Sequence, residues 1–81
     1  MNDDLLQNLA KLHTTELGIV RIKKNLSLET EDVVVWCASQ ISKAHKIERK
    51  GKNWYAYVED FVLTINAHSF TIITAHKEKR S

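Results

Sequence analysis

The chain has 81 residues, of which 43% are hydrophobic and 27% charged, with a formal net charge of +2. A chain of this length forms one domain with a small core, close to the lower limit for folding without a metal or a disulfide. The only cysteine, Cys37, excludes an internal disulfide, and its position between Trp36 and Ala38 favours a buried, unreactive thiol in a reducing compartment.

The sequence contains no apolar run long enough to span a membrane. Its first residues, Met1-Asn2-Asp3-Asp4, are acidic where a secretory signal has cations followed by a hydrophobic stretch. We therefore expect a cytoplasmic protein without membrane association.

Charge is unevenly distributed along the chain. Residues 1–42 contain six acidic and four basic residues, whereas residues 43–81 contain four acidic and eight basic ones. A positive field of this kind attracts polyanions such as nucleic acids. The alternative is that these lysines serve only to keep the surface soluble.

The first half of the sequence predicts three helices. Residues 3–12 begin with acids and place three leucines on one face. Thr14 or Thr15 is suited to cap a second helix, for which Asn25 is a candidate left-handed stop. A second capping cluster, residues 27–32, precedes an apolar stripe from Val33 to about Ala44, which predicts the third helix.

The second half changes to a period of two, which predicts strands at residues 46–50, 53–59, 61–67 and 70–76, with Gly51-Lys52 as the first turn. The predicted fold is therefore α+β, with about three N-terminal helices packed on a four-stranded antiparallel β-meander. It is a single domain, residues 1–81, with a helical half (1–44), an antiparallel sheet (45–76) and a charged tail (77–81).

Alternation assigns side chains to the two faces of the sheet. In the second and third strands, the residues expected to face the helices are Trp54, Ala56, Val58, Phe61, Leu63 and Ile65. The opposite face is then expected to carry Tyr55, Tyr57, Thr64 and Asn66. The fourth strand is ambiguous because its two faces are about equally apolar; the set Phe70, Ile72, Thr74 and His76 is the one we expect to face the core.

The four histidines show no metal-ligand spacing such as HxxxH or HExxH, and no nucleotide-binding glycine loop is present, so neither a metal nor another cofactor is expected. Metal-free RNA cleavage, in contrast, needs only a general acid, a general base and cations on the phosphate. The candidates for proton transfer are His76, His13 and Glu16. The candidates for substrate binding are Arg21, Lys24, Lys52, Tyr55, Tyr57, Asn66 and Lys77, in which the tyrosines would stack on bases.

Four blocks in order carry a family resemblance: residues 13–18 (HTTELG), 21–26 (RIKKNL), 50–55 (KGKNWY) and 64–77 (TINAHSFTIITAHK). They resemble a bacterial family known only as domain of unknown function 3781. The order of helices and strands is similar, much more weakly, to the small metal-independent RNases that include barnase, the RelE toxins, EndoU and colicin nucleases. That similarity implies a sheet whose open face holds RNA, although none of their catalytic motifs matches here.

Two functions follow as hypotheses. The first is an RNA-directed protein, and specifically a metal-independent endoribonuclease. The alternative is a non-enzymatic interaction module, an inhibitor or adaptor of mobile-element or phage origin, with Trp54, Tyr55, Tyr57 and Phe70 as anchors. The expected partner is accordingly RNA, or a protein such as an antitoxin, and the small size makes a homodimer an alternative to a monomer.

Gly18 is one of only two glycines and falls inside the second predicted helix, where glycine costs about 1 kcal/mol relative to alanine. We expect it to allow close packing.

Overall fold

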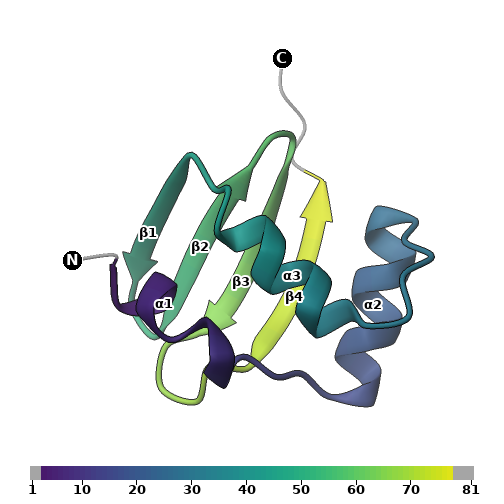
Figure 1. The fold of residues 1–81 in the computed structure, drawn as a ribbon, viewed down its shortest axis with the longest axis horizontal. Helices are drawn as coiled ribbons and strands as arrows, with labels where there is room; N and C mark the ends of the chain where they lie inside the picture. The colour runs from purple at the N-terminus through teal and green to yellow at the C-terminus, as the bar shows by residue number, and fades with distance from the viewer. Residues whose placement is uncertain (1–2, 78–81) are drawn as a thin grey trace.

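A computed structural model describes residues 3–77 (Figure 1). The elements in chain order are α1 (Asp3–Gln7), the 3-10 helix η1 (Leu9–Lys11), α2 (Glu16–Leu26), α3 (Val33–Ile41), β1 (Lys46–Lys50), β2 (Asn53–Val58), β3 (Phe61–Asn66) and β4 (Ile72–Lys77). The predicted α+β class is confirmed: three α-helices are followed by a four-stranded antiparallel sheet.

The helical half differs in detail from the prediction. The expected helix over residues 3–12 is divided at Asn8 into α1 and the 3-10 turn η1, although Leu5 and Leu12 are both buried as the leucine spacing predicts. Helix α2 begins after Thr15, whose hydroxyl accepts a hydrogen bond from the Gly18 amide at 3.0 Å. The predicted left-handed stop at Asn25 is wrong: the helix continues to Leu26, and the next residue, Ser27, takes the left-handed conformation (φ 55°).

The strands follow one another in the order β1-β2-β3-β4, each antiparallel to the next. Lys50 pairs with Asn53, so Gly51 and Lys52 form a two-residue hairpin loop in which Gly51 has φ 60°. Such tight turns need positive φ, which glycine adopts without steric cost. The predicted turn is therefore confirmed.

The core lies between the sheet and the helices, which cover the near face of the sheet and the outer side of β4 in Figure 1. The predicted inward set of β2 is confirmed, since Trp54, Ala56 and Val58 are all buried. In β3, Leu63 and Ile65 are fully buried, and the half-buried Phe61 stacks on Trp36 with ring centroids 5.6 Å apart. Burial of these side chains is the main stabilising contribution to a domain this small.

The prediction for the fourth strand is wrong beyond its first residues. Ile65 pairs with Ile72, but Thr64 pairs with Thr74, so Ile73 is an extra residue opposite the Thr64–Ile65 step. A bulge of this kind exchanges the two faces of the strand. Ala75 is therefore buried, whereas Thr74 and His76 lie on the open face with Thr64 and Val62.

None of the helices within residues 3–77 is long and apolar enough to cross a bilayer.

Candidate functional site

The face of the sheet that the described helices leave uncovered is the first candidate site, and we call it the open face. Its residues form rows across the strands, which the pairing registers define. One row is Lys46, Tyr57, Val62 and His76; the next is Glu48, Tyr55, Thr64 and Thr74; the third is Lys50, Asn53 and Asn66. The structure thus places the predicted residues Tyr55, Tyr57, Asn66 and His76 on one surface.

Both tyrosines of the open face are partly exposed, and they lie two residues apart on β2, about 6–7 Å along the strand. Their partners on β3 are small: Val62 is 5% exposed and Thr64 is 7% exposed. Little of β3 is therefore accessible on this face, and the two rings supply its exposed aromatic surface. Lys46 Nζ is 5.7 Å from the centroid of the Tyr57 ring, which adds a cation to this surface.

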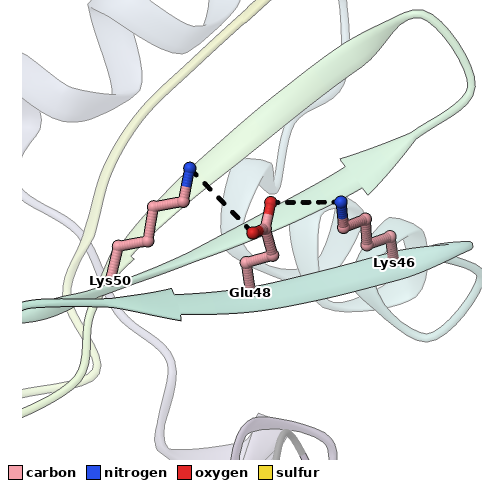
Figure 2. Close-up of polar contacts among 3 residues, drawn as sticks. All are labelled: Lys46, Glu48 and Lys50. Carbon is pink, nitrogen blue, oxygen red and sulfur yellow. Dashed lines mark ion pairs between the residues drawn. The ribbon is translucent and has the colours of Figure 1, made fainter.

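The β1 edge of this face carries a ladder of charges (Figure 2). Glu48 lies between Lys46 and Lys50, with carboxylate-to-ammonium distances of 3.4 and 3.9 Å. One acid is thus shared by two lysines, so the ladder keeps a net positive charge.

The two histidines proposed for proton transfer lie at opposite ends of β4. His13 forms a parallel bridge with Thr71 just before the strand, whereas His76 is the penultimate residue of β4. Five residues of extended chain separate the two positions by roughly 15 Å. A general acid and base must both reach the reacting atoms within hydrogen-bond distance. The geometry does not bring His13 and His76 to the same phosphate.

His13 instead belongs to a chain of hydrogen bonds. Its Nδ1 is 3.1 Å from the Lys11 carbonyl and its Nε2 is 2.9 Å from Thr71 Oγ1; that hydroxyl is 2.7 Å from Ser69 Oγ, which donates to Asn66 Oδ1 at 3.2 Å. Three of these contacts, from His13 Nε2 to Thr71, from Thr71 to Ser69 and from Ser69 to Asn66, need one proton each. The two hydroxyl groups supply only two of these protons. All four bonds therefore form together only when both ring nitrogens carry protons, and a neutral imidazole completes three of them.

Four other predicted site residues, three on α2 and one on β4, are separated from the open face. Glu16 is in the first turn of α2, and Arg21 and Lys24 are exposed on the same helix, which packs beside β4. Lys77 pairs with Phe61 and so belongs to the opposite side of the strand from His76. These four residues form no common site with Tyr55 and Tyr57.

A pocket of about 430 Å³ lies at one end of the sheet, lined by Arg49, Lys52, Asn66, His68 and Ser69. Of these, Lys52 and Asn66 are among the predicted binding residues, whereas nothing in the sequence predicted that Arg49, His68 and Ser69 would share a pocket with them. The available signal was topological: in a meander, the first and third turns lie at the same end of the sheet. The Ala67 amide donates to the Lys52 carbonyl at 2.8 Å and so joins these two turns.

The chain matches one known protein family over most of its length. The family described as protein of unknown function (DUF3781) matches residues 6–76, which include the open face and the pocket. The chain belongs to this family. No curated protein and no solved structure matches it.

Thiol chemistry and metal binding depend on residues elsewhere in the chain. Cys37 is fully buried, as predicted from its neighbours, and burial raises the pKa of its thiol to about 12, which favours the neutral thiol. Within residues 3–77, no three His, Cys, Asp or Glu side chains are grouped so that they could hold a metal ion.

Proposed function

We propose that this protein binds single-stranded RNA through the open face of its sheet, in the cytoplasm. The observation that carries the proposal is the pair Tyr55 and Tyr57, two partly exposed rings on one strand, with Lys46 over the Tyr57 ring. Aromatic rings on an exposed sheet stack on unpaired bases, and nearby cations attract the backbone. The buried thiol of Cys37 suits a reducing compartment.

Burial weakens the alternative of a protein-docking module. Its proposed anchor Trp54 is only 3% exposed, and its ring packs against Phe70 with centroids 5.2 Å apart. An interface anchor has to be accessible to a partner. In the remaining aromatic pair, Tyr57 lies opposite Lys46 and Tyr55 lies opposite Glu48, which is itself paired with two lysines. Lysines are depleted in protein interfaces and abundant in sites for nucleic acids.

Fluorescence anisotropy with a labelled single-stranded RNA tests the proposal. We expect salt-dependent binding, which Tyr57→Leu weakens about tenfold or more because base stacking contributes roughly 1–3 kcal/mol per base. Tyr57→Phe keeps the ring and is the matched control. If Tyr57→Leu binds as tightly as Tyr57→Phe, the open face is not the binding surface.

A second pair of variants tests the electrostatic part. Lys46 lies over the Tyr57 ring, so Lys46→Gln should reduce the slope of log affinity against log salt by about 0.7 for one lost phosphate contact to a single strand. Lys24→Gln removes the same charge from α2, away from the open face, and should leave the slope nearly unchanged. Equal effects of the two variants would indicate a general attraction rather than a site.

Cleavage is tested in the same samples. The RNase hypothesis now depends on His76, which is exposed in the same row as Tyr57 and far from His13. If RNA is cleaved in the presence of EDTA, His76→Ala should abolish cleavage and retain binding. If the RNA binds but stays intact, the RNase hypothesis is wrong and RNA binding remains the proposed function.

A further inference from the structure

The pocket at the end of the sheet is basic and has no acid in its lining. Three of its five lining residues, Arg49, Lys52 and His68, carry nitrogen groups that donate hydrogen bonds to anions. Glu48, the neighbour of Arg49 in sequence, points to the other face of β1 and forms ion pairs with Lys46 and Lys50 (Figure 2). The positive charge of the pocket is therefore not neutralised by this carboxylate.

Arg49 is oriented before any ligand arrives. Its Nε donates to the Gly51 carbonyl at 2.9 Å, and its guanidinium carbon is 5.7 Å from the centroid of the Trp54 ring. One edge of the guanidinium is thus used to hold the side chain, and within residues 3–77 its two Nη groups have no hydrogen-bonded partner. A fixed guanidinium with free N–H groups matches the oxygens of a phosphate.

The loop on the other side of the pocket is held just as firmly. Asn66 Oδ1 accepts hydrogen bonds from the amides of His68 and Ser69 at 2.9 and 3.0 Å, and the Phe70 amide donates to the Asn66 carbonyl at 2.8 Å. Phe70 has φ 60°, an uncommon conformation for a bulky residue that only a well-determined loop retains. His68 is therefore presented by a fixed backbone.

We propose that this pocket binds a phosphate monoester, and that in the complex with RNA it holds the terminal phosphate of the strand. The second part rests on the proposed function. Asn66 and its partner Asn53 form the row next to Tyr55, about 6–7 Å away along the strands. Asn66 lines the pocket, so a terminal nucleotide stacked on Tyr55 would extend its phosphate past the Asn66 row toward the pocket. Arg49, which pairs with Trp54, borders the pocket from the opposite face of the sheet. A monoester carries up to two negative charges, which match several convergent cations better than the single charge of a diester does.

Three oligonucleotides of one sequence test the proposal by anisotropy: one with a 5′-phosphate, one with a 3′-phosphate and one with hydroxyl groups at both ends. We expect one phosphorylated oligonucleotide to bind at least about tenfold more tightly than the hydroxyl-ended one. His68→Ala and Lys52→Gln should both remove this difference, and His68→Ala should leave the affinity for the hydroxyl-ended strand within about twofold. Lys43→Gln, beyond the opposite end of β1, is the matched control and should keep the difference.

Equal affinity of all three oligonucleotides would overturn the terminal-phosphate assignment while leaving RNA binding intact. So would a loss in His68→Ala that is the same for all three. The pocket itself is tested separately by NMR with adenosine 5′-monophosphate and adenosine. If the amide signals of residues 66–69 shift with the monophosphate but not with adenosine, the pocket binds a phosphate monoester even if no RNA binds. The absence of such shifts overturns the phosphate site.

Discussion

The two edges of the sheet are protected in different ways. On the outer side of β4, backbone and side-chain groups from residues 13–25 form hydrogen bonds to the strand and to Phe70 before it. The His13 amide donates to the Phe70 carbonyl at 3.2 Å, and the Ile72 amide donates to the His13 carbonyl at 2.7 Å. Thr14 Oγ1 donates to the Ile72 carbonyl at 2.8 Å, and Asn25 Nδ2 donates to the Ala75 carbonyl at 3.1 Å.

On the other side, β1 is the terminal strand and carries alternating charges on the open face, with Lys46 and Lys50 on either side of Glu48. Lysines on an edge strand oppose pairing with another chain without contributing much to stability. The two edges therefore differ in role. We call the outer side of β4, with residues 13–18 bound to it, the closed edge, and β1 with the turn after it the open edge, which remains accessible to a ligand.

The largest test of the closed edge is Phe70, where the loop meets His13. Phe70→Ala should lower the free energy of unfolding by about 3 kcal/mol, since it removes the packing on Trp54. Phe70→Gly should be less destabilising than Phe70→Ala by roughly 1 kcal/mol, because only glycine adopts φ 60° without steric cost. Urea denaturation of the two variants measures the difference.

The matched control lies in the same loop. The φ angle of Ala67 is not positive, so Ala67→Gly should lower the free energy of unfolding, because glycine loses more backbone entropy on folding than alanine does. If Phe70→Gly also unfolds more easily than Phe70→Ala, the left-handed backbone does not contribute to the closed edge.

Gly18 tests how α2 is attached to the same edge. A methyl group at Gly18 would overlap Thr14 Oγ1, the atom that donates to Ile72, so Gly18→Ala should cost about 1–3 kcal/mol and lower the melting temperature. Helix propensity alone predicts a gain of about 1 kcal/mol. In a Thr14→Ala background the overlap is absent, so the cost of Gly18→Ala should largely disappear. A higher melting temperature for the single variant would contradict the close packing.

The faces of β2 and β3 could be predicted from the sequence, whereas those of β4, at the closed edge, could not. Side-chain periodicity determined the face of β2, where Trp54 and Ala56 alternate with tyrosines, and the pairing with β2 extends the same faces to β3. It did not determine β4, where both faces are similarly apolar and a bulge at Ile73 reverses them. That bulge follows the segment paired with His13, a contact across 58 residues that local sequence does not encode.

One part of the candidate site could likewise be predicted from the sequence and another part could not. The open face with Tyr55 and Tyr57 follows from strand alternation on two neighbouring strands, so the sequence was sufficient to predict it. The pocket needs the turn at Lys52 and the loop at His68 to lie side by side, which depends on topology and on one backbone hydrogen bond between the turns. His13 carried a catalytic prediction because of its residue type, but its ring nitrogens are engaged within the closed edge.

A smaller effect is expected from a single hydrogen bond of the closed edge. Thr14→Val keeps the shape of the side chain but removes the donor to the Ile72 carbonyl, which should lower the free energy of unfolding by about 1 kcal/mol. Thr30→Val, in the loop between α2 and α3, makes the same substitution away from the sheet and should change stability little. Urea denaturation of both variants measures the difference, and equal stabilities would mean that this bond does not hold the edge.

The smallest effect on stability is expected at the open edge. Glu48→Gln removes both ion pairs of the ladder, yet these pairs are exposed, so the free energy of unfolding should change by less than about 0.5 kcal/mol. The same variant leaves Lys46 and Lys50 without a neutralising carboxylate, so its affinity for single-stranded RNA should rise at low salt and converge with the wild-type value at high salt. Urea denaturation and anisotropy on the same samples measure the two effects. A loss of more than about 1 kcal/mol without a gain in affinity would mean that the charge ladder holds β1 in the sheet, and the contrast between a closed edge made for stability and an open edge made for binding would then fail.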